Sequence, residues 1–219
     1  MNENISSMLR RIDVLTHSSV RIETAKGKVI YIDPYEMDGI RADADIVFFT
    51  HSHYDHYSTD DADLVMKGTT LMVYPEDMDE QIVEDYDIPE EDRCRVTPGQ
   101  SCNFRGWSFD TVAAYNIKAA FHPKKNHWVG YILKIDGLRI YIAGDTDATA
   151  EAKNVRCDIA LLPVGGKFTM DAEEAAELTR AITPQVVIPT HYGTVAGTPE
   201  DGERFKDLVG EDCDVVIPY

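Results

Sequence analysis

Four side chains of the kinds that bind metal ions stand close together in the segment Thr50-His51-Ser52-His53-Tyr54-Asp55-His56. Imidazole and carboxylate groups are common ligands of Zn²⁺ and similar ions in proteins. A bound ion of this kind lowers the pKa of water to about 7, so that hydroxide is available at neutral pH. A single histidine here would indicate an ordinary polar loop. Three histidines and one aspartate within six positions predict a metal centre instead.

The elements around this segment explain how its side chains would be held. The apolar run Asp45-Ile46-Val47-Phe48-Phe49 before it predicts a buried β-strand. Because alternate side chains of an extended chain point the same way, His51 and His53 would converge on one point. The pair Asp55-His56 follows as the chain turns, and would face a second point nearby. A helix is expected directly afterwards, with Ser58 as its N-terminal cap.

Other candidate ligands lie farther along the chain. Asp33, Asp145 and His191 each closely follow an apolar segment that is typical of a strand. Residues in such places also serve as turn residues or helix caps, so their position alone does not assign them to a metal. Two further histidines, His122 and His127, lie in the loop between two predicted strands. From the residues themselves, either histidine could complete a site.

The His-x-His-x-Asp-His pattern resembles the signature of the metallo-β-lactamase superfamily. That superfamily also has an early Asp after a strand, a further His, a bridging Asp after a later strand and a final His, and this chain offers candidates in the same order. The resemblance extends from Asp13 to Tyr192. It implies an α/β fold of the four-layer αββα type, formed by a single hydrolase domain over residues 1–219.

The resemblance also implies a set of site residues and a cofactor of two divalent metal ions, with Zn²⁺ expected first and Mn or Fe compatible with the same ligands. Asp55 would in addition take up a proton as a catalytic residue, and Asp33 would orient the histidine-rich loop through hydrogen bonds. The first ion would be held by His51, His53 and His122, and the second by Asp55, His56 and His191, with Asp145 bridging the two.

A narrower resemblance concerns two histidines outside the main pattern. The segment Phe121-His122-Pro123-Lys124 resembles a small bacterial and archaeal branch related to the ascorbate-phosphate lactonase group, and in that branch His122 would be the ligand. The superfamily more often places this ligand at the end of the preceding strand, where this chain has Tyr115-Asn116. By the same resemblance, His17 would lie near the active site, as an orienting or substrate-binding residue.

Composition limits the classes of partner. The chain has 21 basic and 39 acidic residues and a net charge of −18, which disfavours nucleic acid and anionic membranes as partners. The segment Glu76 to Asp92 contains ten acidic residues and no basic one. The N-terminal segment Met1 to Arg11 lacks the apolar stretch of a signal peptide, so we expect a cytoplasmic protein. The oligomeric state is left open.

These observations favour an enzyme that uses a hydroxide bound between two metal ions to hydrolyse a small-molecule substrate. An ester, a lactone or a phosphoester would suit this chemistry, and the lactonase-like resemblance makes lactones the first class to test. The alternative is a non-catalytic metal-binding or sensor protein that acts through its acidic surface patch. Turnover of such substrates after metal loading separates the two hypotheses.

Overall fold

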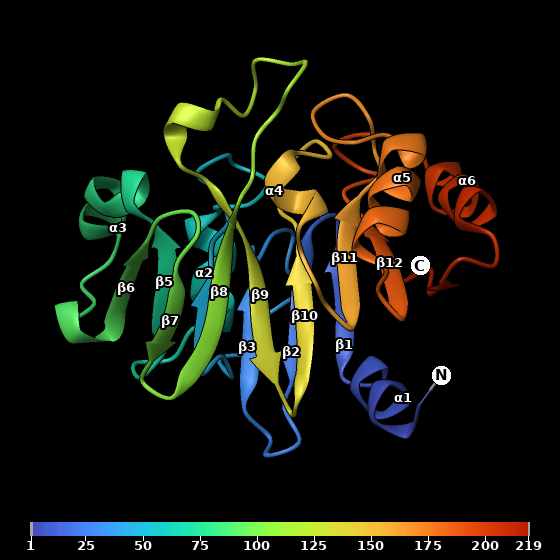
Figure 1. Ribbon diagram of the computed structural model, residues 1–219. Coiled ribbons are helices and arrows are strands. Elements are labelled where there is room, and N and C mark those ends of the chain that lie inside the picture. The colour runs from blue at the N-terminus through green and yellow to red at the C-terminus, as the bar shows by residue number, and fades with distance from the viewer. Residues whose placement is uncertain (1, 219) are drawn as a thin grey trace.

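Two β-sheets face each other and helices cover their outer sides, as the computed structural model of residues 2–218 shows in Figure 1. The alternation of side chains along the strands produces this layering. On the strand before the histidine-rich segment, Ile46 and Phe48 point between the sheets, whereas Val47 points outward to the helices. The structure is therefore the four-layer αββα sandwich that the sequence predicted.

The first sheet has six strands in the order of the chain, and contains the strand that leads into the histidine-rich segment. Its first three strands are antiparallel neighbours, and its last four run parallel. The strands are β1 (Ile12–Thr16), β2 (Ser19–Glu23), β3 (Val29–Ile32), β4 (Ile46–Phe48), β5 (Leu71–Pro75) and β6 (Arg93–Val96).

The second sheet has seven strands in the order β13-β12-β11-β10-β9-β8-β7. The strands from β7 to β10 pair antiparallel, and those from β10 to β13 pair parallel. They are β7 (Ser101–Phe104), β8 (Trp107–Ala113), β9 (Val129–Ile135), β10 (Leu138–Ile142), β11 (Ile159–Pro163), β12 (Val186–Thr190) and β13 (Asp214–Val215).

Helices close the outer face of each sheet over an apolar layer. The first sheet is covered by α2 (Thr59–Val65) and α3 (Asp79–Asp85), and the second by α4 (Ala150–Lys153), α5 (Ala172–Ile182) and α6 (Glu200–Val209). A further helix, α1 (Glu3–Leu9), lies below the strands and buries Ile5 and Met8 in the layer between the sheets. Between residues 2 and 218, no helix combines the length and apolar character needed to cross a membrane.

The acidic segment from Glu76 to Asp92 forms α3 and two short 3₁₀ helices, η1 (Glu76–Met78) and η2 (Glu90–Asp92). Several of its carboxylates have partners within the protein. Asp79 accepts a hydrogen bond from Tyr74, and Asp77 accepts one from the indole of Trp128. Part of this acidity therefore stabilises the fold.

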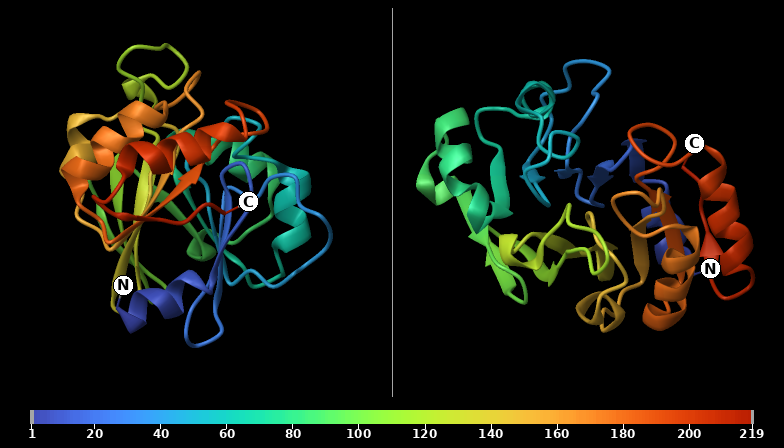
Figure 2. Two further views of the ribbon diagram at one scale, coloured as in Figure 1. Left: turned by 90° about the vertical axis from the view of Figure 1, so that its right-hand side faces the viewer. Right: turned by 90° about the horizontal axis from the view of Figure 1, so that it is seen from above.

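The loops that follow β4, β8, β10 and β12 meet at one end of the sandwich. This is the upper end in Figure 1, where the long loop between β8 and η3 (Lys124–Asn126) rises above the strands. Seen from above in Figure 2, the first sheet lies on one side of this end and the second sheet on the other. The predicted ligands therefore come from both sheets and meet between them.

Candidate metal centre

Asp33 organises the histidine-rich loop from the end of β3. Its Oδ1 accepts a hydrogen bond from the backbone N–H of Thr50 at 2.8 Å, and its Oδ2 accepts one from the Thr50 hydroxyl at 2.6 Å. The same Oδ2 lies 2.7 Å from Nδ1 of His56. A hydrogen on this Nδ1 leaves Nε2 free to point at a metal ion. Asp33 thus has the contacts expected of an orienting residue.

A second set of contacts orients His51 and His53. The Nδ1 of His51 lies 3.0 Å from the hydroxyl of Thr50, so a donated hydrogen again leaves its Nε2 free. This Nε2 stands 3.1 Å from Nδ1 of His53. The ring of Trp128 packs against both imidazoles, with centroid distances of 4.9 and 4.8 Å. The structure brings His51, His53 and His122 together as one group with metal-ligand spacing.

Asn116 fixes the orientation of His122, although the two are separated by a loop. Its side-chain oxygen accepts a hydrogen bond from the His122 backbone at 3.0 Å and lies 2.9 Å from Nδ1 of that ring. The amide of Asn116 in turn donates to Asp147 at 2.8 Å and to the carbonyl of Phe168 at 2.9 Å. The Nε2 of His122 is thereby turned toward the centre.

The second group combines Asp55, His56 and His191 with His17. The Nε2 of His17 lies 3.1 Å from Oδ2 of Asp55, and its Nδ1 lies 3.1 Å from the hydroxyl of Thr194. The His17 and His191 rings pack with their centroids 3.9 Å apart. His17 therefore holds the carboxylate of Asp55, and its own Nε2 also lies within ligand spacing of this group.

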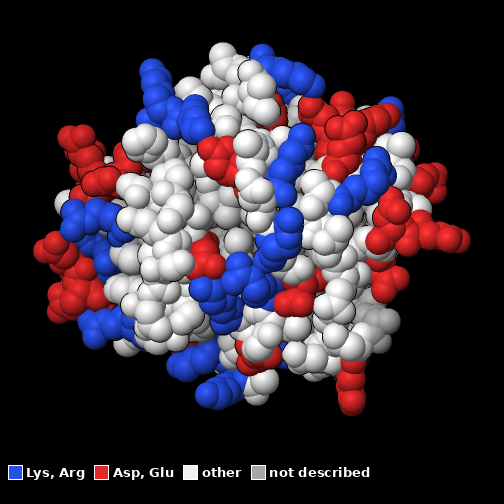
Figure 3. Space-filling view, viewed as in Figure 1, with Lys and Arg blue, Asp and Glu red and all other residues white. Residues whose placement is uncertain are grey.

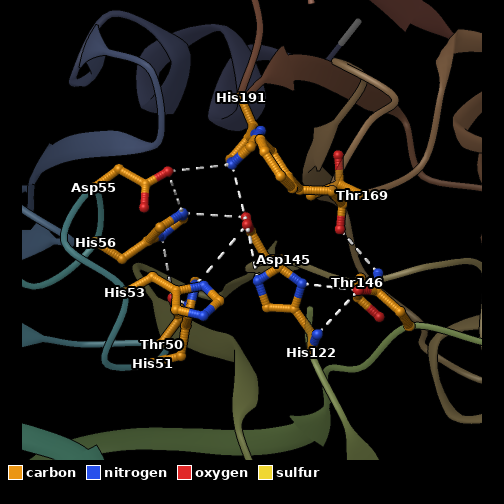
Figure 4. A network of polar contacts seen from close by, with 12 residues as sticks. Thr50, His51, His53, Asp55, His56, His122, Asp145, Thr146, Thr169 and His191 are labelled. Carbon is orange, nitrogen blue, oxygen red and sulfur yellow. Dashed lines mark hydrogen bonds and ion pairs between the residues drawn. The ribbon is translucent and has the colours of Figure 1, made fainter. Parts of the chain in front are cut away.

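Asp145 stands between the two groups, as Figure 4 shows. Both of its oxygens are used: Oδ1 faces His56, and Oδ2 faces His51, His122 and His191. A carboxylate in this position can bridge two ions. The distances from its oxygens to Nε2 are 3.0 Å for His191, 3.2 Å for His56, 3.2 Å for His122 and 3.9 Å for His51.

The backbone at this centre is unusual in two respects. His17, Asp33 and His191 have positive φ angles of 47°, 46° and 57°, which side-chain-bearing residues adopt at a cost. In addition, Gly165 lies so close to the next loop that a β-carbon there would be 2.1 Å from the carbonyl oxygen of His191. The absence of a side chain at Gly165 therefore lets the two loops pass close to each other at the site.

Burial and charge set the protonation of the central groups. Burial lowers the pKa of His51 well below its usual range, so its ring is neutral at pH 7. Burial alone would raise the pKa of Asp145, but the neighbouring His191 and His56 lower that pKa well below its usual range. For His56, burial opposes the charged form, yet Asp145 and Asp33 raise the pKa well above its usual value.

The donor atoms also test whether a metal ion fits. Buried polar atoms almost always have a hydrogen-bond partner. Within the described residues, four atoms that face one another at this centre have none: Nε2 of His56, His122 and His191, and Oδ1 of Asp145. Deprotonated imidazole nitrogens and carboxylate oxygens without hydrogen-bond partners are the donors that a divalent ion requires, and a bound ion would displace the proton that the raised pKa keeps on His56. These residues therefore fit a metal ion.

His127 lies outside this arrangement. It ends η3 with a positive φ of 56°, and its side chain is exposed. It lines a separate groove of about 970 Å³, which is also lined by Trp128 and contains none of the predicted ligands. Of the two histidines in the loop, only His122 is placed with His51 and His53.

Three orienting contacts were not recognised in the sequence: Thr50 to His51, Asn116 to His122, and Thr194 to His17. The role of Thr50 could have been suspected from the sequence, because Thr50 directly precedes the histidine-rich motif. Asn116 occupies a position where the superfamily usually has a metal ligand, which indicates a role in the site. The sequence does not show that this role is to orient His122. Thr194 carried no signal, since its partner is far away in the sequence.

Fold and site together define a class of protein. The chain belongs to the β-lactamase superfamily, whose domain it matches over residues 11–191.

Similar proteins and solved structures include other metal-dependent hydrolases and proteins of the same fold. A metal-dependent hydrolase of Pyrococcus furiosus is 33% identical, over 94% of this chain and 95% of the relative. Igni18, a metallo hydrolase of the archaeon Ignicoccus hospitalis, has a solved structure that is 25% identical, with a TM-score of 0.77 over 94% of this chain and 93% of that chain. A metallo-β-lactamase superfamily protein from Thermotoga maritima shares the fold at 18% identity, with a TM-score of 0.61 over 94% of this chain and 96% of that chain.

Proposed function

We propose that this protein is a metal-dependent hydrolase of a small ester, lactone or phosphoester. Its cofactor would be two divalent ions, with Zn²⁺ as the first ion to test. The observation that carries the proposal is the convergence of two ligand groups on the buried carboxylate of Asp145, with donor atoms that have no hydrogen-bond partner. The relatives described as metal-dependent hydrolases support the same activity.

Each of the two ligand groups would hold one ion. His51, His53 and His122 would hold one ion, while His56 and His191 would hold the other with Asp55. When bound, such ions supply hydroxide at neutral pH and polarise the carbonyl or phosphoryl group under attack.

Asp55 has an ionised side chain, as a metal ligand requires. Burial alone would raise its pKa, but the hydrogen bond with His17 and the neighbouring ring of His191 lower the pKa well below the usual range, so the carboxylate is ionised at neutral pH. His17, whose side chain is fully buried, lies 3.1 Å from this carboxylate. The lowered pKa makes Asp55 a weak base, so this environment favours binding of a metal ion over uptake of a proton from a reacting group.

Replacement of the central carboxylate tests the proposal. Asp145→Asn should remove most hydrolysis by the Zn²⁺-loaded protein, with kcat falling at least about 100-fold, because an amide binds cations poorly and cannot bridge them. Circular dichroism should show that the fold is retained. Asp207→Asn, which removes one exposed carboxylate from α6, is the matched control.

The substrate panel should contain a γ-lactone, an aryl acetate and an aryl phosphodiester. Normal turnover by Asp145→Asn would show that Asp145 is only a turn residue. Metal binding without turnover of any panel member would instead favour the non-catalytic metal-binding alternative.

A further inference from the structure

The loop that carries His122 exposes an unusual number of apolar side chains. Ile117 is 62% exposed and Phe121 is 48% exposed, although both belong to residue types that normally lie in the core. Ala120 between them is also exposed. The charged residue of this stretch, Lys118, pairs with Glu174 at 2.6 Å, so its charge is locally balanced. Apolar side chains grouped on a surface commonly mark a binding site.

Contacts tie this apolar loop to the first ligand group. Phe121 directly precedes His122 and packs edge to face on Phe168, with ring centroids 4.8 Å apart. The carbonyl of Phe168 accepts a hydrogen bond from Asn116, the residue that orients His122. The ammonium group of Lys167 lies 4.6 Å from the centroid of the Phe168 ring. The aromatic pair Phe121–Phe168 is thus attached to the predicted ligand His122.

A second aromatic pair is attached to the other ligand group. Tyr54 directly precedes Asp55 and is 66% exposed. Its ring lies 6.1 Å from that of Tyr35, and the Tyr35 ring lies 6.2 Å from the ring of His17. His17 in turn holds Asp55. The aromatic pair Tyr35–Tyr54 is thus attached to the predicted ligand Asp55, directly through Tyr54 and indirectly through His17.

The two aromatic pairs come from segments of different sheets. Phe121 and Phe168 follow β8 and β11 of the second sheet, whereas Tyr35 and Tyr54 follow β3 and β4 of the first sheet. Seen from above in Figure 2, the yellow-green loop after β8 lies on the side of the second sheet. Among the predicted ligands, His53 is the one whose side chain is partly exposed. A substrate would therefore reach the centre beside His53.

We propose that the aromatic pairs Phe121–Phe168 and Tyr35–Tyr54 determine substrate specificity by binding an apolar group next to the bond that is hydrolysed. The preferred substrate is then a neutral ester or lactone that carries an extended alkyl or aryl group. Aromatic rings provide a large apolar contact area, and Lys118, the charged residue beside Ile117, is already paired with Glu174. This inference rests on the proposed hydrolase function.

A chain-length series tests the inference by activity. Zn²⁺-loaded protein would be assayed with γ-butyrolactone, γ-hexalactone, γ-octalactone and γ-decalactone. Burial of each added CH₂ should raise kcat/KM by about threefold to fourfold until the apolar surface is filled. Phe121→Ala and Tyr54→Ala should reduce this dependence on chain length, whereas Leu208→Ala on α6 should leave it unchanged.

Binding of lactams gives a readout that needs no turnover. N-hexyl-2-pyrrolidone and N-methyl-2-pyrrolidone keep a neutral carbonyl but resist hydrolysis, and their affinities can be compared by calorimetry. The hexyl compound should bind the Zn²⁺-loaded protein at least about tenfold more tightly, and both alanine variants should lose this preference. Leu208→Ala on α6 is the matched control, since Leu208 is 37% exposed and lies outside both aromatic pairs.

The outcomes separate this inference from the function on which it rests. Hydrolysis of γ-butyrolactone without any preference for longer chains or for the hexyl lactam would overturn the inference and leave the hydrolase proposal intact. A hexyl preference without hydrolysis of any lactone or ester would support the apolar site and count against the proposed activity. A change of oligomeric state in Phe121→Ala, with the hexyl preference unchanged, would show that the apolar loop is an interface between copies and would also overturn the inference.

Discussion

At the scale of single residues, His122 and Asn116 show how the centre is assembled. The ring of His122 is buried, and Asn116 binds both its backbone N–H and its Nδ1 side. A histidine held at one nitrogen presents the other in a fixed direction, which is how proteins orient metal ligands. His127, five residues later, has an exposed ring and lines a groove that contains none of the predicted ligands.

The two histidines should therefore differ in their effect on metal binding. His122→Ala should weaken binding at one of two sites by at least about tenfold, because loss of a ligand should cost no less than the 10–100-fold typical of a lost orienting contact. His127→Ala should leave both affinities unchanged within about twofold. Calorimetric titration of metal-free protein with Zn²⁺ measures both effects, and the opposite ranking would exclude His122 as a ligand.

The role of a site residue could be predicted from the sequence where its surroundings are formed by residues that are near it in the chain. Roles that depend on distant segments could not be predicted. The motif from His51 to His56 was readable because a strand fixes the direction of neighbouring side chains over a few residues. His122 was favoured over His127 through the resemblance, but the residues alone left both open. The role of Asn116 could not be read, because its partner depends on how the loop from 117 to 121 folds back.

At the scale of elements, the start of α5 is stabilised by its N-terminal cap. The side chain of Asp171 accepts a hydrogen bond from the backbone N–H of Glu174 at 2.8 Å. Asp171 also pairs through its backbone with Gly165, in the loop that approaches His191. The cap thus connects a helix to the metal centre.

Removal of this cap should have a measurable cost. Asp171→Ala should lower the free energy of unfolding by about 1 kcal/mol, and the Tm by about 2–4 °C for a chain of this size. Asp171→Asn keeps a side-chain oxygen and should lose much less. Thermal unfolding followed by circular dichroism gives both values, and equal losses in the two variants would show that the cap contributes little.

A second element-scale contact joins the early strands of the first sheet. Just before β4, Asp45 accepts hydrogen bonds from the backbone N–H of Val29 and from the ammonium groups of Lys28 and Lys67. Burial alone would raise the pKa of Asp45, but these hydrogen bonds lower the pKa below its usual value. Such a carboxylate stabilises the fold above its unfolded-state pKa of about 3.9, and this contribution is lost as the pH falls through the folded-state value.

Asp45→Asn should therefore reduce stability at pH 7 by about 1 kcal/mol and should lessen the further loss of stability between pH 5 and pH 2. Urea unfolding at a series of pH values measures this difference. Asp207→Asn, with its exposed carboxylate on α6, should leave the pH dependence unchanged. An unaltered acid profile in Asp45→Asn would mean that other carboxylates dominate acid unfolding.

Most strands and the longer helices were predictable from local patterns, whereas the pairing of the strands was not. Alternation and turn residues locate a strand to within one or two positions, but they do not say which strands become neighbours. Helix α1 was also missed, because its buried face consists of only two apolar residues, Ile5 and Met8. The four-layer arrangement itself came from the resemblance to a known family.

At the scale of the whole molecule, the net charge of −18 is distributed unevenly. On the face shown in Figure 3, basic side chains form a band near the middle and acidic ones gather toward the sides. Some basic residues of the second sheet pair with carboxylates, since Lys134 on β9 and Arg139 on β10 both contact Asp110. The total charge therefore does not describe each face separately.

Metal ions should stabilise the whole fold as well as the site. An ion that binds only the folded state at 100 times its Kd adds about 2.7 kcal/mol, which corresponds to about 5–10 °C in Tm. We expect Zn²⁺ to raise the Tm of metal-free protein by this amount and a chelator to reverse the effect. Saturation should occur at about two ions per chain, since the candidate ligands are too many for one four-coordinate site. Saturation at one ion would contradict a dinuclear centre.

The left-handed backbone at His17, Asp33 and His191 has a consequence for how this protein could evolve. Each of these residues would be conformationally more relaxed as glycine, by about 1 kcal/mol or more. Selection for stability alone would therefore favour loss of His191, whose ring nitrogens have no hydrogen-bond partner within the described residues, over loss of Asp33, whose carboxylate holds Thr50 and His56. Laboratory evolution toward heat resistance, without a requirement for activity, should accumulate glycine or asparagine at position 191 first. Retention of His191 in a stabilised lineage would measure how strongly function is selected.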